Sequence, residues 1–155
     1  MVGIMQSSNK TGYTLLEIMI TIVIILGLAA LAIPRFGTQV KRIRSSEAAQ
    51  MLLIIFGEQK DYFRENNVYA DDTLWSDLGI DKPTLDNFGA IVLDDGTTNL
   101  SCGLGGNVQY IARTTSNDGE YTLYALTSGE IACKPVTGTC PGSPCTNMGY
   151  GDFTP

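Results

Sequence analysis

Residues 13–33 are the segment that most constrains the fold of this chain, because they are almost entirely apolar. The run is interrupted only by Thr14, Glu17, Thr21 and Gly27. As an α-helix it would be roughly 30 Å long, at about 1.5 Å per residue. That length matches the hydrocarbon thickness of a bilayer. We therefore expect residues 13–34 to form a helix that spans a membrane once.

Glu17 is the one charged residue inside this run, and a carboxylate in apolar surroundings is costly unless a cation neutralises it. One alternative is a cleaved signal peptide, with Ala30-Leu31-Ala32 as its small-x-small cleavage site. A simple one-span anchor is another. However, the run exceeds the usual signal core of about 7–15 residues, and a helical pattern continues beyond Pro34. We therefore expect the segment to be retained and Glu17 to meet a partner on assembly.

The residues around Glu17 form a recognisable motif. The run from Gly12 to Ile20 reads G-Y-T-L-L-E-I-M-I, and Pro34 closes the apolar stretch. This pattern resembles the N-terminus of type IV pilins and type II secretion pseudopilins, and it covers the first third of the chain. The resemblance implies that residues 1–12 are a leader, which a prepilin peptidase removes after Gly12. It also implies methylation of the new N-terminus at Tyr13.

The same resemblance assigns roles within the apolar helix. Residues 13–34 would form the filament core as well as the membrane span, and Glu17 would guide assembly by pairing with the N-terminal amine of a neighbouring copy. Gly27 and Pro34 mark a place where the helix is distorted. Two departures from the family pattern are visible. Tyr13 stands where phenylalanine is usual, and Gly27 falls one place later than the common glycine.

Residues 35–66 show an amphipathic pattern. Apolar residues recur there at helical spacings of three, four and seven, namely Ala48, Met51, Leu52, Ile55, Tyr62 and Phe63. The pair Asn66-Asn67 is suited to end this helix. We therefore expect a single helix of about 50 residues, with its second half packed against a globular domain.

Residues 67–155 are expected to form that globular head. A short helical turn is expected within residues 69–80, and strand-like runs follow at residues 89–93, 108–115, 120–127 and 131–134. Ser116-Asn-Asp-Gly119 and Ser128-Gly129 are typical hairpin turns. The predicted fold class is α+β, a pilin-like long helix whose second half packs on an antiparallel sheet of three or four strands.

The head contains all four cysteines, Cys102, Cys133, Cys140 and Cys145. An even number in a Gly- and Pro-rich region favours disulfides in an oxidising compartment. Four cysteines can form two disulfides in three different ways. The short loop between Cys140 and Cys145 leads us to expect a bond between them and another between Cys102 and Cys133, which would staple the C-terminal region.

Charge and composition exclude several functions. The net charge is −6, and acidic residues crowd the second half, which argues against nucleic acid as the main partner. Histidine is absent, which removes the commonest general base and most zinc chemistry. No catalytic constellation is visible, so we expect neither an enzyme nor a cofactor. Asp71-Asp72 and Asp94-Asp95-Gly96 offer oxygens for calcium, but they lack EF-hand spacing, and we favour solvated acidic turns.

The resemblance, together with these observations, predicts a structural subunit, a type IV pilin that polymerises with copies of itself through its N-terminal helix into a cell-surface pilus. Its further partners would be the prepilin peptidase, a pilus or secretion assembly platform, and the inner membrane before assembly. The C-terminal part would lie outside the cytoplasm, and then in an extracellular pilus. The alternatives are a major pseudopilin of a type II secretion system, in a periplasmic pseudopilus, and an exported membrane-anchored binding domain. The cysteines favour the pilin, because pilins of this kind often close a C-terminal loop with a disulfide.

Basic residues after the apolar run argue against this orientation. The run is followed by Arg35, Lys41, Arg42 and Arg44 and preceded only by Lys10. The positive-inside rule would place the C-terminal part in the cytoplasm. The leader and the cysteines favour the outside, and we expect the basic residues to contact acidic groups of neighbouring subunits.

Overall fold

The computed structural model describes residues 12–100, 108–137 and 142–150, without the side chains of residues 31–35. The chain divides into two compact units, Met1–Gly37 and Thr38–Pro155. Helix α1 (Leu15–Asn66) contributes residues to both units.

Helix α1 has 52 residues, in agreement with the single long helix that the sequence predicts. It begins after Thr14, whose carbonyl oxygen accepts from the N–H of Ile18 at 3.2 Å. It ends at the predicted pair, because Asn67 takes the left-handed backbone conformation with a φ of 59°. The N–H of Asn67 donates to the carbonyl of Phe63 at 2.8 Å. Asparagine tolerates this conformation better than most residues, so it is suited to stop a helix.

The predicted membrane span is not supported by the structure. Within the part of the chain that the structure describes, no helix is both long and apolar enough to cross a membrane. The side chains of residues 31–35, at the end of the apolar run, lie outside that part.

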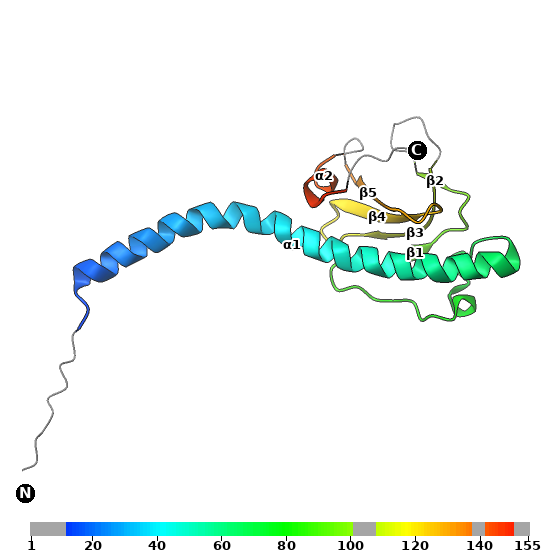
Figure 1. Cartoon of the computed structure of the whole chain (residues 1–155), viewed down its shortest axis with the longest axis horizontal. Coiled ribbons are helices and arrows are strands. Elements are labelled where there is room, and N and C mark those ends of the chain that lie inside the picture. The colour runs from blue at the N-terminus through cyan, green and yellow to red at the C-terminus, as the bar shows by residue number, and fades with distance from the viewer. Residues whose placement is uncertain (1–11, 101–107, 138–141, 151–155) are drawn as a thin grey trace, which may run out of the picture. The chain divides into compact units, whose positions relative to one another are not determined.

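The head is built on a five-stranded antiparallel sheet. The strands are β1 (Val92–Leu93), β2 (Asn99–Leu100), β3 (Val108–Thr115), β4 (Tyr121–Leu126) and β5 (Ile131–Pro135). The order is β1-β3-β4-β5, and β2 also pairs with β3. The second half of α1 lies along this sheet (Figure 1). The structure therefore confirms the predicted α+β fold.

Strands β3, β4 and β5 closely match their predicted ranges, whereas β1 is shorter than predicted and β2 was not predicted. Residues 89–91 lie before β1, where the Gly89 N–H donates to the Thr115 carbonyl at 2.8 Å and the Thr114 hydroxyl donates to the Gly89 carbonyl at 2.8 Å. Strand β2 has only two residues in a polar stretch, so no alternating pattern marks it in the sequence.

One face of α1 supplies the helical part of the core. Its fully buried positions are Ser45, Ala48, Leu52, Ile55 and Gln59. Three of them, Ala48, Leu52 and Ile55, share a hydrophobic cluster with Ile111 of β3 and Leu123 of β4. The predicted stripe is confirmed at its centre. Towards the helix end Phe63 is still 36% exposed, and its ring stacks on that of Tyr69, with centroids 4.6 Å apart.

The opposite face of the sheet has a second, smaller cluster. It consists of Leu100, Tyr110, Tyr124, Leu126 and Ala132, with Val108 packed against it. The rings of Tyr110 and Tyr124 meet edge to face, with centroids 4.9 Å apart. All six residues of β4 are consequently buried, which explains why apolar and polar residues do not alternate along this strand.

The C-terminal region departs from the sequence-based expectation. Helix α2 (Cys145–Met148), which was not predicted, lies beside β5 (Figure 1) and is joined to it by a Cys133–Cys145 disulfide. Both predicted pairings are therefore wrong, because each needs a sulfur that this bond already uses. The two Cα atoms of the bond are 5.6 Å apart, so the fold of β5 and α2 brings together cysteines that are 12 residues apart. The other two cysteines, Cys102 and Cys140, lie outside the described residues. The short helical turn predicted within residues 69–80 is confirmed as a 3₁₀ helix, η1 (Trp75–Leu78).

Candidate functional site

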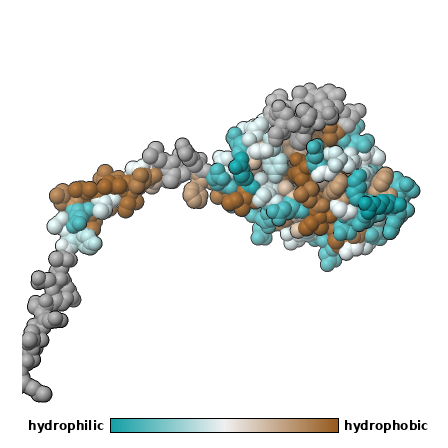
Figure 2. Space-filling view, in the orientation of Figure 1, coloured by the Kyte–Doolittle hydropathy of each residue, from teal (hydrophilic) through white to brown (hydrophobic). Residues whose placement is uncertain are grey.

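The first turns of α1 carry large apolar side chains that no described residue covers. The exposed ones are Leu15, Leu16, Ile18, Met19, Ile20, Ile22, Val23, Ile24, Ile25, Leu26 and Leu28, and Tyr13, just before the helix, is exposed too. Figure 2 shows this stretch as a run of hydrophobic surface. A helix that is apolar on all sides is one that other apolar groups bury. This segment is therefore the candidate functional site, as a surface for assembly.

Thr14 caps the helix at the start of this segment. Its hydroxyl oxygen accepts a hydrogen bond from the backbone N–H of Glu17 at 3.2 Å. The first four N–H groups of a helix have no partner within the helix, and a threonine at this position satisfies one of them. The role of Thr14 did not emerge from the sequence analysis, although T-L-L-E has the spacing of a capping box.

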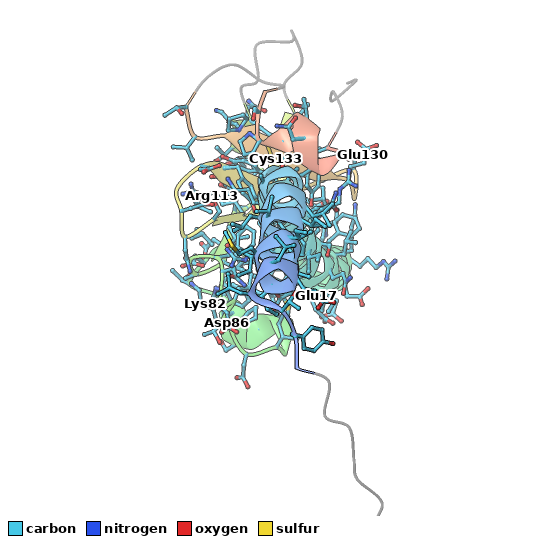
Figure 3. The ribbon with its side chains drawn as sticks, turned by 90° about the vertical axis from the view of Figure 1, so that its left-hand side faces the viewer. Glu17, Lys82, Asp86, Arg113, Glu130 and Cys133 are labelled. Carbon is cyan, nitrogen blue, oxygen red and sulfur yellow. A yellow bond between two sulfur atoms is a disulfide. The ribbon has the colours of Figure 1, made fainter. Side chains whose placement is uncertain are left out.

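Glu17 is the acidic residue in the first turn of α1, and its side chain is exposed (Figure 3). The hydrogen bonds and ion pairs found among the described residues do not include its carboxylate. Its negative charge is favourable at this end of the helix, where the backbone dipole is positive. The carboxylate is thus exposed at a capped first turn, where a group from another molecule can reach it.

The remaining predicted site residues near this segment take the following positions. Gly12 and Tyr13 precede the helix and are exposed. An added Cβ at Gly27 would meet nothing within 4 Å. The helix continues through Gly27 and Pro34, so a distortion on packing stays a prediction, as do the cleavage after Gly12 and the methylation of Tyr13.

The basic residues that follow Pro34 have partners within the head. Lys41 forms an ion pair with Glu120 and lies 4.0 Å from Asp118. The Nε of Arg42 donates to the Met148 carbonyl at 3.1 Å. These contacts join α1 to the β3–β4 turn and to α2. Lys41 and Arg42 therefore contact groups of their own subunit, whereas the sequence led us to expect contacts with neighbouring subunits.

Two of the acidic turns are closed by their own backbone. The Asp71 carboxylate accepts from the N–H of Thr73 at 2.8 Å, and Asp94 accepts from the N–H of Gly96 at 3.1 Å. Among the described residues, no group of three or more Asp, Glu, Cys or His side chains is placed to hold a metal ion. Asp71 and Asp94 therefore serve as turn-forming residues in this structure.

Asp72 connects three parts of the head. Its carboxylate accepts from the Trp75 indole N–H and the Lys82 ammonium, both at 2.9 Å, and from the N–H of Leu93 at 3.2 Å. Partial burial alone would raise the pKa of Asp72, but the hydrogen bonds from Trp75, Lys82 and Leu93 outweigh it and lower the pKa below 3.8. Asp72 thus holds the segment that follows α1 against β1.

Comparison with known proteins supports the resemblance seen at the N-terminus. The chain is 43% identical over 63 residues to the type IV major pilin protein PilA of Myxococcus xanthus (strain DK1622). The match covers 41% of this chain and 29% of the relative, so the chain spans less than a third of the length of that relative. No family model matches the chain, and no solved structure matches it. The similarity to a major pilin, on a chain with a long N-terminal helix and an antiparallel sheet, supports its placement in the type IV pilin family.

Proposed function

We propose that this chain is a type IV pilin, a structural subunit that polymerises through residues 13–34 of its N-terminal helix into a cell-surface pilus. The observation that carries the proposal is the exposed apolar segment of α1, in which Glu17 is the one charged residue among residues 13–30. Such a surface gains free energy when copies of itself cover it, at roughly 25 cal/mol for each Å² of apolar area removed from water.

Processing after Gly12 would make this surface competent for assembly. It would create a positively charged amine at Tyr13, close to the same end of the helix as Glu17. In a core of packed apolar helices the Glu17 carboxylate needs a cation, and the amine of a neighbouring copy supplies one. A buried ion pair must offset the cost of removing both charges from water, so its main contribution is to set the register of the helices.

The test replaces Glu17 in the full chain and measures filaments. Glu17→Gln keeps the shape of the side chain and removes the charge, and Asp81→Asn is the matched control on the exposed surface of the head. We expect Glu17→Gln to leave the amount and fold of the protein unchanged, while filaments in sheared surface material disappear or lose their regular diameter in electron micrographs. Normal filaments from Glu17→Gln would contradict the proposal.

The N-terminus gives a second test. Mass spectrometry of the mature protein should find Tyr13 as the first residue, with one added methyl group. A first residue at Ile33, left by cleavage after Ala32, would instead identify an exported domain without an assembly helix. Filaments confined to the periplasm would identify a pseudopilin.

A further inference from the structure

Helix α2 and the two residues after it contact the part of α1 where its buried face begins. Ser45 lies at this point and is 1% exposed. The Tyr150 hydroxyl donates to the Ser45 carbonyl at 3.3 Å, and the Nε of Arg42 donates to the Met148 carbonyl of α2 at 3.1 Å. Two hydrogen bonds therefore join residues 142–150, which we call the α2 segment, to one turn of α1.

Cys145 connects the α2 segment both to the sheet and to Tyr150. Its sulfur is bonded to Cys133 of β5, and its carbonyl accepts from the N–H of Tyr150 at 3.1 Å. The chain can turn back in this way because Gly149 has a φ of 93°, a conformation that favours glycine. A continuous path thus runs from β5 through Cys145 and Tyr150 to the Ser45 carbonyl of α1.

Gly149 also gives Arg42 access to the end of α2. An added Cβ at Gly149 would lie 3.2 Å from Nη2 of Arg42, which is closer than an ordinary contact. The last carbonyls of a helix have no partner within the helix, and Arg42 supplies one for Met148. A side chain at position 149 would push the guanidinium away from this carbonyl.

The α2 segment depends on its surroundings for its shape. Its helix has four residues, far fewer than the roughly 12–15 that a helix needs to be stable in isolation. Its buried side chains, Cys145 and Met148, belong to the same hydrophobic cluster as Ala48 and Leu52 of α1. Breaking the bond to Cys133 would leave this packing and the two hydrogen bonds, without the cross-link that lowers the entropy cost of forming them.

A different contact holds the same part of α1 from the other strands. Lys41 forms an ion pair with Glu120 and lies 4.0 Å from Asp118. Both carboxylates belong to the turn between β3 and β4, so this contact involves neither the α2 segment nor the disulfide. It therefore serves as a control at nearly the same place on the helix.

We propose that the α2 segment is a redox-controlled clasp on α1, which closes when Cys133 and Cys145 are oxidised. Closing it removes two electrons and two protons from the two thiols and reduces a disulfide oxidant to two thiols. In the oxidised chain Tyr150 and Arg42 hold the turn at Ser45 against the head, and in the reduced chain the segment releases that turn. The inference goes beyond the proposed function and does not depend on filament formation.

The first experiment measures hydrogen exchange in the full chain by mass spectrometry, at residues 42–49 and, for comparison, at residues 55–60. The double variant Cys133→Ala with Cys145→Ala keeps the clasp open. We expect exchange to rise on the order of tenfold more at residues 42–49 than at residues 55–60, because only the first stretch loses contacts. A purely global loss of stability would speed both stretches equally, and that result would overturn the proposal.

The second experiment asks whether the contact of Tyr150 depends on the disulfide. Tyr150→Phe should speed exchange at residues 42–49 on the order of fivefold in the oxidised chain, and should add nothing in the cysteine double variant. Glu120→Gln should change exchange by the same factor in both backgrounds, since independent contacts are additive. The proposal is wrong if Tyr150→Phe has its full effect without the disulfide, or if the effect of Glu120→Gln disappears along with it.

The third experiment opens the clasp with the disulfide intact. Gly149→Ala displaces Arg42 from α2, and Gly79→Ala is the matched control, because Gly79 also follows a short helix with a positive φ but has nothing within 4 Å of an added Cβ. We expect faster exchange at residues 42–49 in Gly149→Ala alone. Equal exchange in the two variants would contradict the proposal even if the cysteine double variant did not fold.

Discussion

The side-chain amide of Gln59 pairs with the backbone of Ala70 as a neighbouring peptide group would. Its Nε2 donates to the Ala70 carbonyl at 2.7 Å, and the Ala70 N–H donates to its Oε1 at 2.8 Å. Both residues are fully buried. The Gln59 side chain thus provides hydrogen-bond partners for both backbone groups of Ala70. Ala70 lies in the segment that turns back after α1, where no strand is available to pair with it.

Truncating this side chain should destabilise the head strongly. Gln59→Ala leaves two buried backbone groups without partners, each at about 1–3 kcal/mol, so we expect the free energy of unfolding to fall by about 2–6 kcal/mol. Denaturant unfolding measures this change. The control Gln50→Ala removes an exposed amide from the same helix and should shift stability by less than about 0.5 kcal/mol.

A methyl group at Gly96 should destabilise the head more than one at Gly119. Both glycines have a positive φ, 76° and 71°, which costs another residue about 1–2 kcal/mol. An added Cβ at Gly96 would lie 2.6 Å from Cδ2 of Tyr69, whereas at Gly119 it would meet nothing within 4 Å. The melting temperature of Gly96→Ala should therefore fall below that of Gly119→Ala. Equal melting temperatures would show that the Tyr69 ring moves aside without cost.

Acid should weaken the head through Asp72. Its pKa is lowered in the folded state, so its contribution is fully present above the ordinary value of 3.8 and fades as the pH falls through the folded pKa. Asp72→Asn should therefore lower the melting temperature at pH 7, and the difference from the unmodified chain should close in strong acid. Asp81→Asn, at an exposed position, should show no such trend. A deficit for Asp72→Asn that is the same at all pH values would rule out this origin.

The cap at Thr14 should be measurable by hydrogen exchange. Thr14→Val removes the hydroxyl that accepts from the Glu17 N–H, and the loss of a threonine cap costs a helix about 0.5–2 kcal/mol. We expect the amides of Glu17 and Ile18 to exchange faster in this variant, and Thr14→Ser to restore their protection. Unchanged exchange in Thr14→Val would show that the first turn does not depend on the cap.

Peptide mapping of the unreduced protein should recover Cys133 linked to Cys145. A disulfide that closes a short loop stabilises a fold by about 2–4 kcal/mol, so the double variant Cys133→Ala with Cys145→Ala should unfold at lower denaturant concentration. Recovery of a Cys140–Cys145 fragment would instead favour the pairing that the sequence suggested.

The long helix, its last residues and three of the strands could be predicted because they depend on local patterns. Periodicity marked the buried side of α1, and Asn67 marked its end. The disulfide depends on how β5 and α2 meet in space, and the spacing of Cys133 and Cys145 in the sequence does not contain that information. Strand β2 is too short to leave a pattern.

The candidate site could be predicted in part: its apolar segment and Glu17 could, and the partners of the basic residues after it could not. The apolar run and Glu17 stand out in the sequence because a charged carboxylate is unfavourable inside an apolar segment. The spacing of Thr14 and Glu17 in T-L-L-E is also that of a capping box. The partners of Lys41 were not predictable, because Glu120 lies 79 residues further along the chain.

The hydrogen bond from the Tyr150 hydroxyl to the Ser45 carbonyl has a consequence for how the protein is made. It joins residues that are 105 positions apart, at 3.3 Å. Ribosomes add about 5–20 residues per second, so Ser45 is synthesised on the order of 5–20 s before its partner exists. During that interval the buried face of α1 has no sheet to cover it. Newly made chains are therefore most prone to aggregation before β3, β4 and β5 emerge, and a chaperone that shields α1 would act at that stage.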